Sequence, residues 1–150
     1  MRSVARYGGL LWLGAGLVLA ACMGPPRAGP GGEAEPLEGT SWQLAELNGQ
    51  PVVGGTGDAV PTLLFAADEA RASGNGGCNQ FNGTYSQNGA LLSFGPLAST
   101  RRACADEAAN RQETAYLRAL ESTTRFSATA GQLVLYGGDQ AVARLVRSGG

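Results

Sequence analysis

The sequence predicts an α+β fold in which an antiparallel β-meander curls into a small barrel-like sheet with a single α-helix, at about residues 105–123. Three observations support this class. Short apolar runs recur between clusters of Gly, Asn, Asp and Pro, one long segment has helical periodicity, and the connections between strands are too short for parallel crossovers. A length of 150 residues favours one folded domain.

The first strands are expected after the N-terminal segment of the chain. Residues 40–47 alternate, which predicts Trp42, Leu44 and Glu46 on one face and Leu47 on the other. The following Asn-Gly pair predicts a tight turn. A second strand is expected at 61–67, and residues 71–74 are expected to return beside it.

The clearest hairpin is centred on Asn88-Gly89. A type I′ turn there predicts that Tyr85 lies opposite Leu92. The expected buried face consists of Phe81, Gly83, Tyr85, Leu92 and Phe94. The other face, with Thr84, Ser86 and Leu91, is expected to be mostly solvated.

Residues 105–123 form the predicted helix. Ala109, Tyr116, Leu117 and Leu120 lie on one side at helical spacing, with Glu113 at the edge of that side. Asp106 and Glu107 suit the positive end of the helix dipole, and Glu107–Arg111 has the spacing of a weak surface pair. Three further strand-like runs follow, at 125–130, 133–138 and 141–147.

Composition excludes several function classes. The formal net charge is −1, whereas nucleic-acid binding requires a basic patch or stripe. Histidine is absent, which removes the usual general base near neutral pH and the commonest metal ligand. We therefore expect no cofactor, no bound metal and no nucleic-acid partner.

Residues 1–21 resemble a lipoprotein signal peptide. Arg2 and Arg6 precede an uncharged apolar run from Leu10 to Ala21, which is short for a membrane span. The run ends in Leu-Ala-Ala-Cys, which looks like a bacterial lipobox with Cys22 as the acylated residue. The rival interpretation is an uncleaved anchor helix, because no charge separates Arg6 from Arg27.

The predicted organisation has three parts: the signal peptide at 1–21, a lipidated Cys22 with a Pro/Gly-rich tether to residue 37, and a domain at 38–150. The tether has almost nothing apolar to bury and is expected to behave as a loose coil. Met23 follows the cysteine in place of Asp. By analogy with enteric lipoproteins, this predicts an outer-membrane anchor and a domain that faces the periplasm.

Two cysteines remain once Cys22 is assigned to lipid. In an oxidising compartment Cys78 and Cys104 most simply form a disulfide, which would stabilise the fold by about 3.5 kcal/mol on the chain-entropy model. A reduced structural pair is the main alternative. A catalytic cysteine lacks a histidine to activate it, and a structural zinc site lacks the four ligands it requires.

Several segments together resemble the META/HslJ family of small bacterial envelope proteins. They are "TSWQLAELNG", "PTLLF", "GNGGCNQFNGTYS", "LLSFGPLASTRRAC", "ETAYLRAL" and "LVLY", which cover residues 40 to about 146. The residues that match the family pattern are Trp42, Gly77, Cys78, Asn79, Gly83, Tyr85, Thr100, Cys104 and Glu113. The resemblance implies an antiparallel barrel-like sheet with one helix, a role in heat-shock or envelope-stress responses, and no catalytic residues. Most of the matching residues also have structural explanations: glycine in turns, asparagine as a cap, and tyrosine and tryptophan in the core.

The leading functional hypothesis is therefore a monomeric, non-enzymatic lipoprotein that supports envelope integrity by binding another envelope component. A second hypothesis is a pilotin-like carrier that holds an acyl chain or a partner's peptide in a cleft of the barrel. A roomy apolar interior would favour the carrier. A third hypothesis, an enzyme with paired carboxylates, has only Asp68-Glu69 and Asp106-Glu107 as adjacent pairs, and these suit a turn and a helix start.

Overall fold

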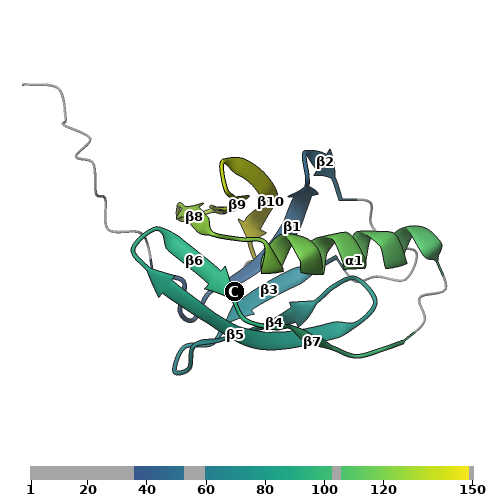
Figure 1. Ribbon diagram of the computed structural model, residues 1–150, viewed down its shortest axis with the longest axis horizontal. Helices are drawn as coiled ribbons and strands as arrows, with labels where there is room; N and C mark the ends of the chain where they lie inside the picture. The colour runs from purple at the N-terminus through teal and green to yellow at the C-terminus, as the bar shows by residue number, and fades with distance from the viewer. Residues whose placement is uncertain (1–35, 53–59, 103–105, 149–150) are drawn as a thin grey trace, which may run out of the picture. The chain divides into compact units, whose positions relative to one another are not determined.

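The computed structural model describes residues 36–52, 60–102 and 106–148. The chain divides into two compact units, residues 1–30 and 31–150, and every described residue lies in the second. The described elements are strands β1 (Ser41–Leu47), β2 (Gln50–Pro51), β3 (Thr62–Phe65), β4 (Arg71–Asn75), β5 (Gln80–Asn88), β6 (Leu91–Phe94), β7 (Ala98–Ser99), β8 (Arg125–Ala128), β9 (Gln132–Gly137) and β10 (Gln140–Arg147), and helix α1 (Glu107–Glu121) (Figure 1).

The strands form a closed antiparallel barrel, which confirms the predicted fold class. The order β1-β3-β4-β5-β6-β8-β9-β10 returns to its start because β10 pairs with β1. Strand β2 pairs with β1, and β7 pairs with β5, outside this ring. The contact between β6 and β8 consists of one residue pair, Leu91 with Arg125, so the ring is least extensively paired there.

Strand β1 differs from its predicted alternation at its end. Trp42 and Leu44 are buried as expected, but Leu47 is also buried and Glu46 is only half-buried. The register between β1 and β10 shifts between Leu44 and Glu46. This bulge reverses the faces of the residues that follow it. The predicted faces of Glu46 and Leu47 were therefore wrong.

The turn after β1 confirms the Asn-Gly prediction, because Asn48 and Gly49 both have positive φ, at 49° and 78°. The hairpin between β5 and β6 differs from its prediction. Asn88 pairs with Leu91, so Gly89 and Ala90 form the turn, and Tyr85 lies opposite Phe94. Each strand keeps its buried face, because the register differs from the predicted one by an even number of residues.

Helix α1 begins at Glu107 and ends at Glu121, two residues inside each end of the predicted range 105–123. Asp106 is its N-cap, and the carboxylate accepts a hydrogen bond from Ala108 N at 2.8 Å. The buried side of the helix carries Glu113, Tyr116, Ala119 and Leu120. Glu113 was expected at the edge of this side but lies within it. The Glu107–Arg111 pair forms at 3.3 Å on the exposed side.

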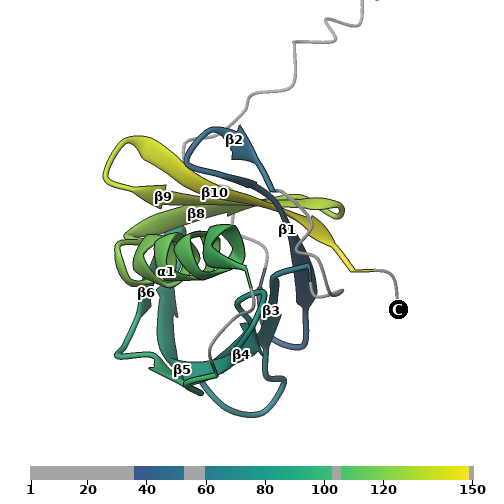
Figure 2. The same cartoon turned by 90° about the vertical axis from the view of Figure 1, so that its right-hand side faces the viewer.

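One hydrophobic core fills the barrel beneath α1. In the view of Figure 2, the helix lies inside the ring that the strands form. The largest fully buried side chains include Trp42, Phe65, Phe81, Tyr116 and Leu37. Burial of Leu37 places it in the packed domain, although the predicted tether extended to this residue. The Tyr116 hydroxyl donates to Thr62 O at 3.3 Å, which joins the helix to β3.

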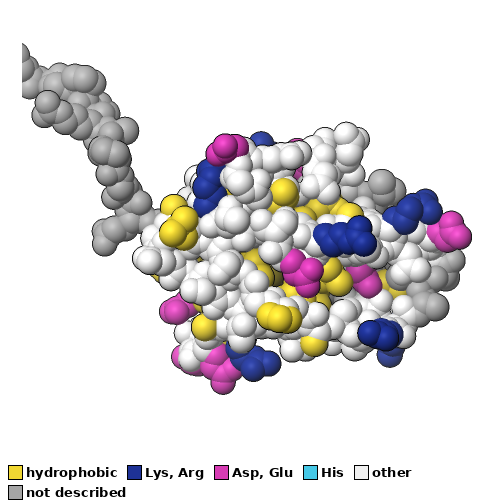
Figure 3. Space-filling view, in the orientation of Figure 1, with side chains coloured by type: hydrophobic (Ala, Val, Ile, Leu, Met, Phe, Trp, Pro, Cys, Tyr) yellow, Lys and Arg dark blue, Asp and Glu magenta, His cyan; other side chains and the backbone are white. Residues whose placement is uncertain are grey.

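The described surface carries interspersed charges of both signs on the face shown in Figure 3. The ion pairs among the described residues are exposed or half-exposed, as for Arg71–Glu69 and Arg144–Glu46. In the described part of the chain, no helix has the length and apolar character required to span a membrane.

Candidate functional site

The structure brings together three of the residues singled out by the resemblance: Asn79, Thr100 and Glu113. Asn79 lies just before β5, Thr100 follows β7, and Glu113 lies in the middle of α1. Three segments that are distant in the sequence therefore meet at one point beneath the helix. Trp42 and Tyr85 lie instead in the hydrophobic core.

Glu113 is a buried carboxylate with three hydrogen-bond donors around it. Its side chain is only 7% exposed. Oε2 accepts from Cys78 N at 3.0 Å and from Asn79 N at 2.6 Å, and Oε1 accepts from Asn79 Nδ2 at 2.6 Å. An ionised carboxylate satisfies such donors without presenting a donor of its own. Glu113 therefore fastens α1 to the turn before β5.

Asn79 uses its whole side-chain amide in this network. Nδ2 donates to Glu113 Oε1 and to Arg102 O, the latter at 3.2 Å. Oδ1 accepts from Thr100 Oγ1 at 3.0 Å and from Arg102 N at 2.6 Å. Both donors and both acceptor positions are thus satisfied. The contacts of this one buried amide hold Thr100 and Arg102, which follow β7.

Thr100 completes the connection on the strand side. Its hydroxyl accepts from Gln80 N at 3.2 Å, and its own N–H donates to Gln80 O at 3.0 Å. Thr100 is itself exposed, but these bonds reach the first residue of β5. We call Asn79, Thr100, Glu113 and the main chain of Arg102 the buried polar network.

Glycines before β5 make room for this network. A Cβ on Gly76 would lie 2.7 Å from Glu113 Cγ and 2.9 Å from Glu113 Oε2. Gly77 has φ of 121°, a conformation that L side chains rarely adopt. Farther along β5, a Cβ on Gly83 would lie 2.6 Å from Leu97 Cδ2. The close approaches explain the glycine at positions 76 and 83, and the positive φ explains Gly77.

An open depression of about 610 Å³ lies beside the buried polar network. Its lining includes Asn79 and Glu113 on the inner side and Ser99 on the strand side. Thr100, the exposed Arg101 and Arg102, and Asn110 of α1 complete the polar lining. We call this hollow the arginine depression, and its guanidinium and amide groups can donate hydrogen bonds to an anionic partner.

The geometry argues against proton transfer by Glu113, because N–H donors already occupy both of its oxygens. No group of three or more Cys, Asp or Glu residues that could hold a metal ion occurs among residues 36–52, 60–102 and 106–148. The adjacent acidic pairs have ordinary roles in the structure. Asp106 caps α1, and Glu69 pairs with Arg71 at 3.7 Å in an exposed turn.

The cysteine predictions fall partly outside the described residues. Cys22 and Cys104 both lie outside the described residues, so the lipid anchor and the Cys78–Cys104 disulfide stay predictions. Cys78 itself is placed by its main chain, whose N–H donates to Glu113. Its position in the turn before β5 is therefore tied to the buried polar network.

Several participating residues were not singled out from the sequence. Gly76 and the main chain of Arg102 contact the network, and Arg101 and Asn110 line the arginine depression. The Gly-Asn-Gly-Gly run before Cys78 carried a usable signal, because a close approach to a buried side chain requires glycine. No sequence pattern identifies Arg102, because it contributes to the network only its main-chain N–H and carbonyl, which are not specific to arginine.

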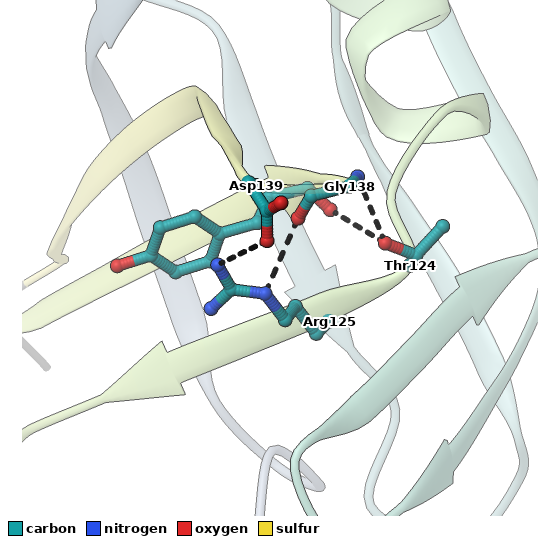
Figure 4. A network of polar contacts seen from close by, with 5 residues as sticks. Thr124, Arg125, Gly138 and Asp139 are labelled. Atoms are coloured by element: carbon teal, nitrogen blue, oxygen red, sulfur yellow. Dashed lines mark hydrogen bonds and ion pairs between the residues drawn. The ribbon is translucent and has the colours of Figure 1, made fainter.

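A second polar cluster lies at the turn between β9 and β10 (Figure 4). Arg125 Nε donates to Gly138 O at 3.2 Å, and its Nη2 lies 3.9 Å from Asp139 Oδ1. The guanidinium also lies 3.9 Å from the centroid of the Tyr136 ring. The Thr124 hydroxyl accepts from Gly138 N at 3.1 Å. This arginine cluster fastens β8 to the turn and does not line the arginine depression.

Three solved structures have a fold similar to that of this chain. An NMR structure of a protein from Burkholderia xenovorans is 31% identical, has a TM-score of 0.63, and matches 75% of this chain and 83% of its own. A second NMR structure is 27% identical with a TM-score of 0.57, covering 75% and 90% of the two chains. A crystal structure of a DUF4847 family protein from Bacteroides vulgatus, 13% identical, has a TM-score of 0.52, covers 74% and 93%, and shares the fold alone.

No curated protein matches the chain. The META domain family model matches residues 35–149, which include every strand and the helix described above. The match therefore extends over the barrel, the buried polar network and the arginine depression. The chain belongs to the META domain family.

Proposed function

We propose that this protein is a non-enzymatic lipoprotein, anchored in the outer membrane through Cys22, whose META domain faces the periplasm and supports envelope integrity by binding another envelope component. The observation that carries the binding proposal is the arginine depression beside a buried polar network. The proposed partner is an envelope protein that presents an acidic segment.

The buried polar network prepares this surface before a partner arrives. Asn79 bonds both the N–H and the carbonyl of Arg102, and Thr100 bonds both main-chain polar groups of Gln80. The main chain that carries Arg101 and Arg102 is thus fixed at two points. A fixed main chain reduces the conformational entropy lost when a partner binds.

The charge of the surface favours an acidic partner over a basic one. Arg101 and Arg102 contribute two guanidinium groups, which bind carboxylates in a bidentate manner. Glu113 is the only acidic side chain in the lining described here, and its oxygens already accept three hydrogen bonds. The exposed donors around it therefore dominate the recognition chemistry.

The alternative carrier function gains no support from the described residues. Trp42, Phe65, Phe81 and Tyr116 pack within the interior that an acyl chain would have to enter. The arginine depression and a second depression of about 560 Å³, beside Ser86 and Gln87 of β5, are both open and have polar groups in their linings. A buried acyl chain would have to displace core side chains, at a large cost in free energy.

The test uses the full-length protein in its own envelope. A null strain is complemented with wild type, with the double variant Arg101→Ala/Arg102→Ala, or with Arg118→Ala, which changes an exposed arginine of α1 outside the depression. We expect the double variant to lose tolerance to heat or envelope-directed drugs and to lose its crosslinked partner. The Arg118→Ala control should retain both.

Two results would contradict the proposal. One is a null strain that matches its parent under every envelope stress, and the other is full complementation by the double variant. Anchoring is checked separately with Cys22→Ser, which should leave an unprocessed precursor. Wild-type protein that partitions into the aqueous phase of a detergent separation would refute the anchor.

A further inference from the structure

Strand β7 lies at an edge of the sheet. It pairs with β5, where Ser99 lies opposite Phe81, and no second described strand pairs with it. After the strand the chain continues beside β5, because Thr100 N donates to Gln80 O at 3.0 Å. One side of this segment is therefore paired with β5, and the other side is open.

The main-chain polar groups of Ser99 and Arg101 lie on the open side. In an extended segment beside an antiparallel neighbour, alternate residues direct their N–H and C=O groups toward that neighbour. Thr100 N–H points toward β5, and the N–H and C=O of Arg102 are both bonded to the Asn79 side chain. The intervening groups of Ser99 and Arg101 therefore point away from β5, and they form no hydrogen bond with another described residue.

The arginine depression runs along this open edge. Its lining includes every residue from 97 to 102, together with Asn110 and Glu113 of α1. In Figure 1, β7 lies beside β5 and below α1. The bonds from Asn79 hold the segment from its paired side, so the edge is in place before a partner arrives. An added strand would lie about 4.8 Å from β7, within this hollow.

Given the proposed function, on which this step rests, we infer that the acidic partner segment binds in an extended conformation and adds an antiparallel strand to the open edge of β7. Its main chain exchanges hydrogen bonds with the N–H and C=O groups of Ser99 and Arg101. The antiparallel direction continues the pairing of β7 with β5 and of β5 with β6. One acidic side chain then lies directly opposite Arg101, on the same face of the sheet as its guanidinium.

The charge of the edge favours an acidic protein segment over a second copy of this chain. Opposite charges on directly paired strand residues are stabilising, and like charges are destabilising. Edge-to-edge pairing of two copies would bring together the arginines at positions 101 and 102 of both. The edge is also short and follows Pro96, and both features limit self-pairing of strands.

The test uses the peptide acetyl-Ser-Thr-Val-Glu-Val-Thr-Ser-amide, whose glutamate can lie opposite Arg101. Its binding to the full-length protein in detergent is followed by amide hydrogen exchange. Exchange at Ser99 and Arg101 should slow when the peptide binds, because their N–H groups gain acceptors. Exchange at Thr100 and Arg102 should change little, because their N–H groups are already bonded.

N-methylated peptides distinguish strand addition from charge attraction alone. With the glutamate opposite Arg101, the N–H groups of the glutamate and the second threonine face β7, and those of the two valines face away. Methylation of the first two nitrogens should weaken binding about tenfold or more, whereas methylation of the two valine nitrogens should leave it unchanged. Replacement of the glutamate by glutamine should weaken binding about tenfold, because it removes the charge opposite Arg101.

Variants of Ser99 test the same edge from the protein side. Ser99→Pro removes an N–H on the open side, and an edge strand tolerates proline there. It should weaken binding of the unmodified peptide about tenfold. Ser99→Ala is the matched control, because it keeps the N–H, and it should bind like wild type. Urea denaturation of both variants checks that the domain remains folded.

Strand addition is overturned if the peptide does not bind at millimolar concentration, if the two methylated peptides bind equally well, or if exchange at Ser99 and Arg101 is unchanged in the complex. The envelope function is judged separately, by complementation with Arg101→Ala/Arg102→Ala. A double variant that fails to complement, together with an unchanged exchange pattern, overturns strand addition alone. Full complementation together with slowed exchange at both residues overturns the envelope function alone.

Discussion

The buried polar network and the arginine cluster play similar structural roles but differ in their exposure to solvent. Each joins a turn to a distant element through side chain and main-chain contacts. Glu113 and Asn79 are 7% and 5% exposed, whereas the Arg125 side chain is 41% exposed and the Asp139 side chain is fully exposed. Removal of one partner leaves unpaired groups buried in the first case and solvated in the second. Burial, rather than the number of contacts, should therefore set the energetic weight of each.

The largest effect is expected for Glu113→Ala. The substitution leaves Cys78 N, Asn79 N and Asn79 Nδ2 without their acceptor in a buried site. The expected loss is about 3–5 kcal/mol in the free energy of unfolding, measured by urea denaturation. Glu113→Gln keeps the shape and one acceptor oxygen, so it should lose less. Equal stability of Glu113→Ala and wild type would refute the role of the network.

The next largest loss of stability is expected for Gly76→Ala, which fills the space beside Glu113. Gly76→Ala places a methyl group 2.7 Å from Glu113 Cγ, so the carboxylate must move away from its donors. We expect a loss of about 1–3 kcal/mol in unfolding free energy. Gly131→Ala is the matched control, because no atom lies within 4 Å of its added Cβ, and it should change stability by less than about 0.5 kcal/mol. Similar values for both variants would contradict the predicted crowding.

A smaller change in the free energy of unfolding is expected at alkaline pH. Burial raises the pKa of Tyr116 above its ordinary value of 10.0, and burial followed by the charge of Glu38 raises that of Tyr85. A raised pKa in the folded state favours the neutral phenol. The contribution of each tyrosine to the free energy of unfolding is therefore fully present below pH 10 and is lost as the pH rises above 10. Tyr116→Phe should flatten this part of the stability profile, and an unchanged alkaline slope would contradict the assignment.

The smallest effect is expected for Arg125→Ala. Its loss removes a hydrogen bond to Gly138 O, a long ion pair and a cation–π contact, all at an exposed position. The expected change is about 0–1 kcal/mol and should decrease further at high salt. Thermal unfolding at low and high ionic strength checks this prediction. A loss as large as that of Glu113→Ala would remove the distinction between the two clusters.

The sequence predicted the elements of the fold because their signals are local. Period-two alternation located the strands, helical spacing located α1, and Asn48-Gly49 indicated a turn that the structure contains. The bulge after Leu44 was missed because it depends on pairing with β10, at the other end of the chain. The hairpin register was missed because Asn88 remains in β5 and Gly89 begins the turn.

The candidate site was predictable only in part. The family resemblance included Asn79, Thr100 and Glu113, but periodicity placed Glu113 at the edge of the helix face. Its partners lie 34 and 35 residues away, so their contact depends on closure of the whole barrel. The spacing of apolar residues also does not identify a buried carboxylate. A buried charge is stable only when donors from distant residues satisfy it.

A double-mutant cycle on Asn79 and Glu113 tests the central claim most directly. Asn79→Ala, Glu113→Ala and the double variant are compared with wild type by urea denaturation. The equivalent cycle on Arg125 and Asp139 provides the comparison. We predict a coupling of about 1–3 kcal/mol for the buried pair, because two hydrogen bonds of 2.6 Å, from Asn79 N and Asn79 Nδ2, join the two residues, and near-additive effects for the exposed pair. Additivity within about 0.5 kcal/mol for Asn79 and Glu113 would contradict the account.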